Sequence, residues 1–170
     1  MSMFCFQCEQ TAFHKACTQK GVCGKDPDIA NLQDKLTSSV IELANCGNIN
    51  DENTKLIIDG LFTTITNVNF DNKSIENLTE KFKNRISCDF KFDVKDIWDC
   101  SEDLRSLKSL ILFGLKGMAA YAYHAWILGY KSEEVNNFFY ETLKELAKET
   151  SSDELIKLIL KVGRIKLKCM

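Results

Sequence analysis

The sequence has 170 residues, of which 45% are hydrophobic and 27% charged, a balance that fits a folded core and excludes a disordered chain. Its 22 basic and 24 acidic residues give a net charge of −2, which excludes a general electrostatic attraction to nucleic acid or to an anionic membrane. A single proline and eight glycines leave few helix breaks, so the composition favours an all-α protein.

Residues 1–25 carry four of the eight cysteines but little that could form a hydrophobic core. The four are Cys5, Cys8, Cys17 and Cys23, with two, eight and five residues between successive members. Such a segment needs something other than packing to order it, and a metal centre would do so. Only the first gap is that of a zinc knuckle, and the longer ones suit a larger centre, so the spacing favours an iron–sulfur cluster. Zinc and free or regulatory thiols are the alternatives.

The neighbours of these cysteines fit the same interpretation. Gly21 and Gly24 would let backbone N–H groups approach the sulfurs of a cluster. Three lysines could offset the negative charge of four thiolates, or could simply form a solvated loop surface: Lys15, Lys20 and Lys25. His14 could replace a cysteine as a ligand, although a surface position is the more common role of such a histidine.

Cysteine usage also bears on the compartment. Residues 1–10 lack the basic and apolar segments of a secretory signal, so we expect a cytoplasmic protein with reduced thiols. The remaining cysteines are then expected to be free thiols rather than disulfide partners: Cys46, Cys88, Cys100 and Cys169.

Residues 26–88 are expected to form a first three-helix bundle. Apolar residues recur at three- and four-residue spacing in the segments 27–46, 51–68 and 72–86. Asp26 followed by Pro27 is typical of a helix start. Residues 89–100 then alternate between apolar and charged side chains, which favours an extended connector or a lone strand.

Residues 101–170 are expected to form a second three-helix bundle, with apolar stripes over the segments 102–129, 133–146 and 152–170. The last stripe has no stop signal, so the chain is expected to end within an element. Gly114 and Gly117 lie inside the first of these helices, where close approach of another helix would compensate for their low helix propensity. On the same helix His124 is expected to be a core or interface residue rather than a catalytic base.

The stretch 110–128 is apolar enough to raise the question of a membrane span. Lys116 near its centre favours a buried core helix instead. We therefore expect no membrane partner and no nucleic-acid partner.

Two separate stretches resemble the hybrid cluster protein family, also called prismane proteins or hydroxylamine reductases. The first is MFCFQCEQTA at residues 3–12 with the later cysteines and the segment NLQD at 31–34, and the second is EDLRSLK at 102–108 with GLKGMAAYAYHA at 114–125. The resemblance implies a [4Fe-4S] cluster on the four cysteines of residues 1–25, with a spacing like that of members from strict anaerobes. It also implies a second, hybrid iron–sulfur–oxygen cluster in later domains, which reduces hydroxylamine to ammonia or nitric oxide to nitrous oxide in defence against nitrosative stress.

The resemblance therefore implies that this chain is the N-terminal, electron-transfer part of such a protein, without ligands for the catalytic cluster. Its implied partners are a ferredoxin-like or NADH-dependent reductase as donor, and the missing C-terminal domains or a partner chain. Apolar stripes on the fourth and sixth expected helices would then lie exposed and cause self-association. The alternative is a standalone helical binding or sensing module, in which the cysteine loop holds a structural iron–sulfur or zinc centre.

Overall fold

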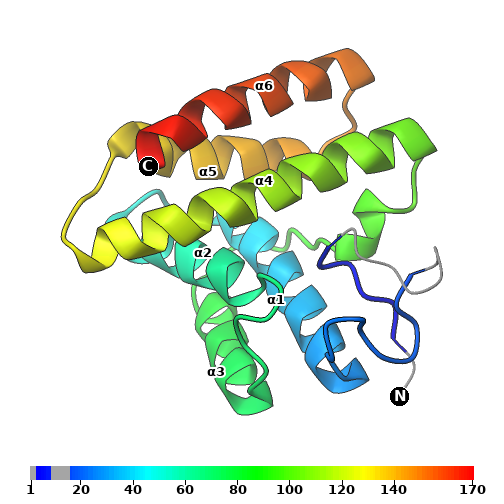
Figure 1. The fold of residues 1–170 in the computed structure, drawn as a ribbon. Coiled ribbons are helices and arrows are strands. Elements are labelled where there is room, and N and C mark those ends of the chain that lie inside the picture. The colour runs from blue at the N-terminus through cyan, green and yellow to red at the C-terminus, as the bar shows by residue number, and fades with distance from the viewer. Residues whose placement is uncertain (1–2, 9–15) are drawn as a thin grey trace.

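The computed structural model of the chain describes residues 3–8 and 16–170, and within them the fold is all-α (Figure 1). The elements in chain order are α1 (Pro27–Cys46), α2 (Asp51–Thr63), α3 (Asn72–Lys83), the short 3-10 helix η1 (Val94–Ile97), α4 (Glu102–Ile127), α5 (Glu133–Leu146) and α6 (Ser152–Cys169). The predicted fold class is confirmed, and the described residues contain no strand.

Side-chain caps explain where most of these helices begin. The Asn50 side chain accepts a hydrogen bond from the Asn53 backbone N–H at 2.8 Å at the start of α2. Ser151 and Glu154 form a capping box at the start of α6. Asp26 occupies the N-cap position of α1, but its side chain makes no capping bond within the described chain, and Pro27 sets the first turn instead.

The second helix is shorter than its apolar pattern predicts. It ends at Thr63, although the pattern continues to Val68. Asn67 has a φ of 64°, in the left-handed region that asparagine tolerates better than other non-glycine residues. The segment after α2 therefore forms turns, and Thr66 and Asn67 become available to line a cavity beside the cysteine loop.

Glycine allows close packing within each group of three helices. In α2, a Cβ added at Gly60 would lie 2.6 Å from Val40 of α1 and 2.7 Å from Phe82 of α3. In α4, a Cβ added at Gly114 would lie 2.8 Å from Val162 of α6, which confirms the predicted close approach at that glycine. Gly117 has only an ordinary contact, because the nearest atom to its added Cβ is the Lys166 Nζ at 3.7 Å.

The two groups of helices share one hydrophobic core. Figure 1 shows α4, α5 and α6 side by side, with α1, α2 and α3 below them, and the main contacts between the groups join α2 to α4 and α1 to α5. A single cluster of buried side chains contains residues of both groups, including Leu36, Leu61, Leu115 and Phe139. The boundary between a first bundle at 26–88 and a second at 101–170 stays a prediction.

The connector runs along α1 without forming a strand. The backbone N–H of Phe92 donates to the Glu42 carboxylate at 3.1 Å, and that of Val94 donates to the Ser38 hydroxyl at 3.0 Å. The chain then turns through η1 before α4 begins. Glu42 and Ser38 of α1 thus hold the connector in an extended conformation along this helix.

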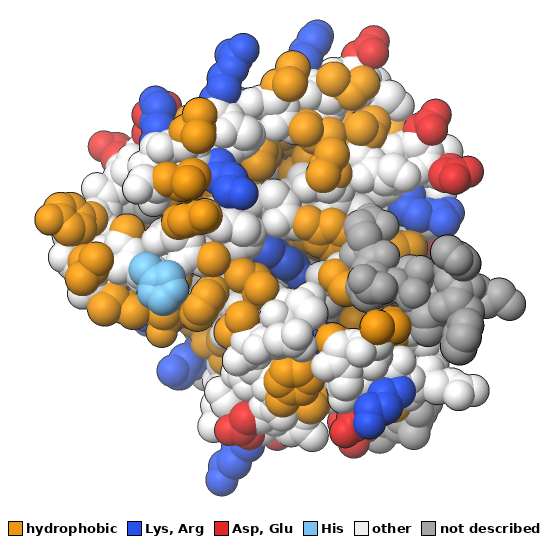
Figure 2. Space-filling view, viewed as in Figure 1, with side chains coloured by type: hydrophobic (Ala, Val, Ile, Leu, Met, Phe, Trp, Pro, Cys, Tyr) orange, Lys and Arg blue, Asp and Glu red, His pale blue; other side chains and the backbone are white. Residues whose placement is uncertain are grey.

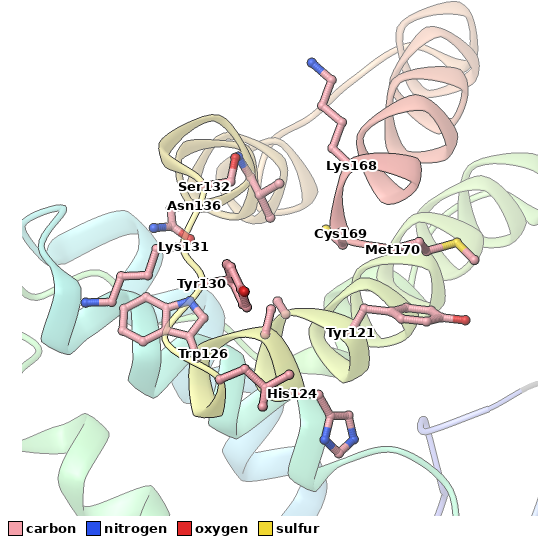
Figure 3. Close-up of a pocket in the computed structure, with 14 residues that line it drawn as sticks. Tyr121, His124, Trp126, Tyr130, Lys131, Ser132, Asn136, Lys168, Cys169 and Met170 are labelled. Atoms are coloured by element: carbon pink, nitrogen blue, oxygen red, sulfur yellow. The ribbon is translucent and has the colours of Figure 1, made fainter.

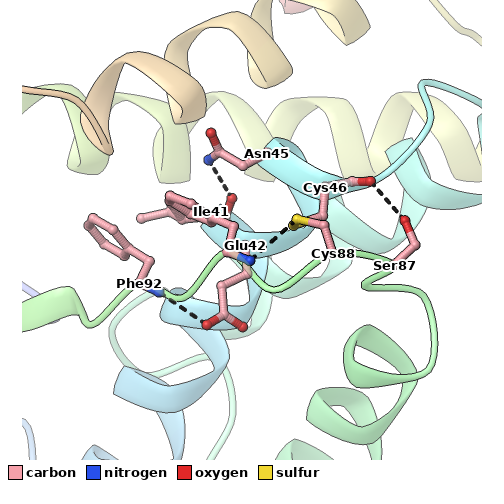
Figure 4. The surroundings of a disulfide bond; sticks show 8 residues. Ile41, Glu42, Asn45, Cys46, Ser87, Cys88 and Phe92 are labelled. Carbon is pink, nitrogen blue, oxygen red and sulfur yellow. Dashed lines mark hydrogen bonds between the residues drawn. A yellow bond between two sulfur atoms is a disulfide. The ribbon is translucent and has the colours of Figure 1, made fainter.

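The expectation that Cys46 and Cys88 are free thiols is wrong in this structure, because the two form a disulfide (Figure 4). Their Cα atoms lie 5.4 Å apart although 42 residues separate them in sequence. After α3 the chain passes the C-terminal end of α1, where Ser87 also donates a hydrogen bond to the Cys46 carbonyl oxygen at 3.1 Å. This proximity is a product of the fold and leaves no local sequence signal.

In α4, Lys116 lies buried near the middle of the apolar stretch, as the sequence predicts for a core helix. Across residues 3–8 and 16–170, none of the helices combines the length and the apolar character that crossing a membrane requires.

Candidate metal centre

All four cysteines of the N-terminal segment line one cavity of about 420 Å³. Its lining consists of Cys5, Gln7, Cys8, Cys17, Gly21, Val22, Cys23, Lys25, Thr66 and Asn67. Cys17 is buried, and the other three thiols are partly exposed. The fold thus brings the four predicted ligands to one place, while their role as ligands stays a prediction.

Backbone hydrogen bonds hold the two arms of the loop together. The Cys5 N–H donates to the Cys17 carbonyl oxygen at 3.1 Å, and the Met3 N–H donates to that of Thr18 at 3.3 Å. These bonds place the first and third cysteines on adjacent segments of the loop, although eleven residues lie between them in sequence.

A tight turn positions the fourth cysteine. The Gly21 N–H donates to the Lys25 carbonyl oxygen at 2.8 Å, and Gly24 has a φ of 89°, which glycine adopts without strain. A Cβ added at Gly21 would lie 3.1 Å from the Cys23 sulfur. Gly21 therefore lets the backbone approach this sulfur closely, while hydrogen bonds from Gly21 and Gly24 to the sulfurs of a cluster stay a prediction.

Aromatic packing anchors the arm that carries Cys5 and Cys8. The rings of Phe4 and Phe6 meet the Trp98 ring edge-on, with centroids 5.5 and 5.3 Å apart. Trp98 follows η1, so the connector supports the cysteine loop directly.

The donor set of the cavity suits an iron–sulfur centre. Thiolates are the usual ligands of such clusters, and they bind at the corners of the cluster rather than at one point. In residues 3–8 and 16–170, no three His, Cys, Asp or Glu side chains are arranged to hold a single metal ion. The cavity is far larger than the roughly 30 Å³ that one water molecule occupies. His14, the possible substitute ligand, lies outside the described residues.

A buried polar network lies directly behind the cysteines. The Gln7 side-chain oxygen accepts hydrogen bonds from the Lys116 ammonium and, at 3.4 Å, from the Thr37 hydroxyl. The Gln7 amide nitrogen donates to the Asp34 carboxylate. One glutamine side chain between two of the cysteines thus connects the loop to α1 and α4.

A second buried lysine lies beside the same cavity. Lys25 is 1% exposed, and its ammonium donates to the Gln33 side-chain oxygen. Gln33 in turn donates to the Asn69 carbonyl oxygen at 2.9 Å. This chain of bonds links the turn at Cys23 to α1 and to the loop that precedes α3.

Burial shifts the titration of this network. It lowers the pKa of Lys116 to about 7, with a further lowering by the Lys25 charge, while Asp34, Cys5 and Cys8 oppose the shift. Burial raises the pKa of Asp34 to about 6, against the hydrogen bond from Gln7 and the charge of Lys116. It also raises the pKa of the Cys5 thiol, against a backbone hydrogen bond from Gln7 and the Lys25 charge.

The three lysines predicted near the cysteines have different positions. Lys25 lines the cavity, whereas Lys20 is exposed with its ammonium 3.8 Å from the Asp26 carboxylate. Lys15 lies outside the described residues. Lys116 is a buried lysine near the cysteines that the sequence did not predict to lie there. Its only indication in the sequence is a single charge within an apolar helix.

A second cavity, of about 450 Å³, lies at the other end of α4, beside the start of α5 and the end of α6 (Figure 3). Its lining includes Trp126, Tyr130 and Cys169, the last with a pKa raised by burial. His124 also lines it and is exposed, so of the two expected positions the core is wrong, while an interface position stays a prediction. Its ring lies edge-on to that of Phe62, with centroids 5.7 Å apart, on the surface of the packed helices.

The molecule is thus an all-α protein with a cysteine-lined cavity backed by buried lysines. The chain belongs to the Prismane/CO dehydrogenase family, whose model matches residues 3–170. Proteins of this family bind iron–sulfur clusters.

Relatives named hydroxylamine reductase match nearly the whole chain. The protein from Clostridium perfringens (strain 13 / Type A) is 40% identical over 204 aligned positions, which cover 96% of this chain and 37% of that protein. The protein from Halothermothrix orenii is 39% identical over 214 aligned positions, which cover 100% of this chain and 39% of that protein. The chain therefore spans less than two fifths of the length of these relatives.

Proposed function

We propose that Cys5, Cys8, Cys17 and Cys23 hold a [4Fe-4S] cluster and that the chain is the electron-transfer part of a hydroxylamine-reductase-type protein. The observation that carries this proposal is the common cavity, which all four thiols line. When bound, such a cluster supplies one-electron transfer. The four thiolates would hold it, and the Gln7 backbone N–H would remain a hydrogen-bond donor beside the Cys5 sulfur.

The reaction proposed for the whole protein needs electrons from outside. Reduction of hydroxylamine to ammonia and water consumes two electrons and two protons, so a one-electron centre would act twice in each turnover. A ferredoxin-like or NADH-dependent reductase is the proposed donor, and a catalytic hybrid iron–sulfur–oxygen cluster, held outside this segment, is the proposed acceptor. Nitric oxide reduction to nitrous oxide in defence against nitrosative stress is the related activity.

A cytoplasmic location is part of the same proposal, because thiolate clusters of this kind suit a reducing compartment. There the disulfide between Cys46 and Cys88 would open, and it would form under oxidising conditions. The ligand cysteines are separate from this pair, so the state of the disulfide does not change the donor set.

The test is purification of the chain without oxygen, followed by iron, sulfide and zinc analysis. We expect a brown protein with about four irons and four sulfides per chain. The Cys17→Ser variant should lose most of the colour, whereas Cys100→Ser, which changes a cysteine outside the cavity, should keep it. A colourless protein with one zinc per chain would contradict the proposal and favour a helical binding or sensing module with a structural metal.

A further inference from the structure

Two lysine ammonium groups are buried beside the cysteine cavity without a carboxylate as hydrogen-bond acceptor. Lys25 is 1% and Lys116 is 4% exposed, and each donates to the side-chain oxygen of a glutamine, which is neutral. Removing an ammonium from water costs several kcal/mol unless an anion lies close enough to compensate. The fold therefore holds two buried lysine amino groups that no carboxylate neutralises through a direct hydrogen bond.

The nearby carboxylate compensates only in part. Asp34 contacts the amide nitrogen of Gln7 rather than either lysine. The other groups whose negative charge, when they are ionised, acts on Lys116 are the thiols of Cys5 and Cys8. The Lys116 ammonium of α4 thus points toward the cavity that the thiols line.

Resting on the function proposed above, we infer that Lys116 is a positioning residue of the cysteine site, which fixes the Gln7 side chain and supplies the buried positive charge that favours an anionic occupant. Gln7 lies between Cys5 and Cys8 in sequence, so a hydrogen bond to its side chain restrains the segment that joins the two sulfurs. Lys116 lies 109 positions after Gln7, so only the tertiary structure brings the two side chains together.

The inference has a direct consequence for the redox equilibrium. A four-thiolate cluster becomes more negative when it gains an electron, and a fixed positive charge nearby stabilises that reduced state more than the oxidised one. Replacing Lys116 with a neutral residue removes this extra stabilisation of the reduced state. The reduction potential should then become more negative.

The chain offers a matched control on the same helix. Lys108 is also buried in α4, and its ammonium donates to the Lys148 carbonyl oxygen at 3.0 Å, in the segment after α5. It does not line the cysteine cavity. Lys108→Met removes the same charge from the same helix and should leave the potential within the error of the unchanged chain.

The experiment is an anaerobic redox titration of the full chain at pH 6, below the pKa of about 7 of Lys116, and it is monitored by visible absorption or by the EPR signal of the reduced cluster. The variants are Lys116→Met, Lys116→Gln and the control Lys108→Met. We expect both Lys116 variants to lower the reduction equilibrium constant about tenfold, a shift of about 59 mV for one electron. Circular dichroism of each variant at the same temperature reports whether the helices are retained.

The outcomes separate this inference from the function on which it rests. A chain that binds no iron–sulfur cluster in its unchanged form would contradict the proposed function itself. A cluster-loaded Lys116→Met or Lys116→Gln chain with an unchanged or raised potential would overturn the inference and leave the function intact. Loss of the helical signal in both Lys116 variants, with Lys108→Met folded, would make Lys116 a structural residue and would also overturn it.

Discussion

The Lys116 ammonium of α4 donates a hydrogen bond to the side-chain oxygen of Gln7, which lies between two of the N-terminal cysteines. This bond joins residues 109 positions apart and is buried at both ends. It makes the cysteine loop and the α4–α6 group parts of one folded unit. Changes in α4 are therefore expected to reach the cysteine site.

The buried network predicts a distinctive dependence of stability on pH in the cluster-free chain. Asp34 has its pKa raised from 3.8 to about 6, so between these values the native state holds a proton that the unfolded state has lost. Its contribution to stability is present below about pH 4 and is lost as the pH rises through about 6. We expect Asp34→Asn to remove this loss, measured by urea unfolding from pH 4 to pH 6.5.

Above about pH 7, Lys116 makes the stability of the fold change with pH in the opposite direction. Its pKa is lowered from 10.5 to about 7, so the unfolded state holds the extra proton between these values. Stability should therefore rise with pH above about 7, by a few kcal/mol in total. In the Lys116→Met chain this rise should be absent, and an identical slope in both chains would contradict the assignment.

The two glycines of α4 should respond oppositely to alanine. Gly114→Ala places a methyl group 2.8 Å from Val162, and the overpacking should cost about 1 to 3 kcal/mol, more than the helix-propensity gain of about 1 kcal/mol. Gly117→Ala meets only an ordinary contact at 3.7 Å and should stabilise the chain by up to about 1 kcal/mol. Thermal unfolding of both variants checks the difference.

A double variant tests the reason for that difference. Val162→Ala removes the atom that an added methyl group at Gly114 would meet. Gly114→Ala should therefore cost less in the Val162→Ala background than alone. Equal effects in both backgrounds would mean that the α4–α6 contact is not what requires the glycine.

The disulfide between Cys46 and Cys88 should stabilise the oxidised chain only. It closes a loop of 42 residues, for which the chain-entropy model gives about 4 kcal/mol. Cys88→Ser should lower the free energy of unfolding by up to this amount in oxidising buffer and should have little effect in dithiothreitol. Cys100→Ser, a change at a cysteine outside the disulfide, is the control, and the effect of this substitution on the free energy of unfolding should be the same with and without the reductant.

The outer face of α6 predicts self-association of the isolated chain. Leu160 is 60% and Leu167 is 72% exposed, and Ile156 lies on the same side of the helix. Figure 2 shows hydrophobic side chains gathered over the α4 and α6 surfaces of the molecule. Size-exclusion chromatography should give an apparent mass above 19.4 kDa, and Leu160→Glu with Leu167→Glu should reduce it. A stable monomer at high concentration would count against the prediction.

Sequence patterns predict the helices well because their causes are local. The apolar stripe that begins after Asp26 gives α1 its observed bounds, and the capping box at Ser151 gives the start of α6. The end of α2 is less well predicted, because apolar residues continue past Thr63 while the backbone turns at Asn67. Val68, the last residue of this stripe, is exposed, so the apolar pattern extends beyond the residues that pack as a helix.

In the candidate site, too, some features have local causes and could be predicted from the sequence, whereas others could not. By itself, the sequence determined the four thiols of the loop and the flexibility of Gly21 and Gly24, because ligand type and spacing are properties of a short segment. Only the tertiary structure decided that Lys116 faces Gln7, that Asn67 reaches the cysteine cavity and that Cys46 meets Cys88. Each of these contacts depends on how helices far apart in the chain pack, since burial and electrostatics act through space and not along the sequence.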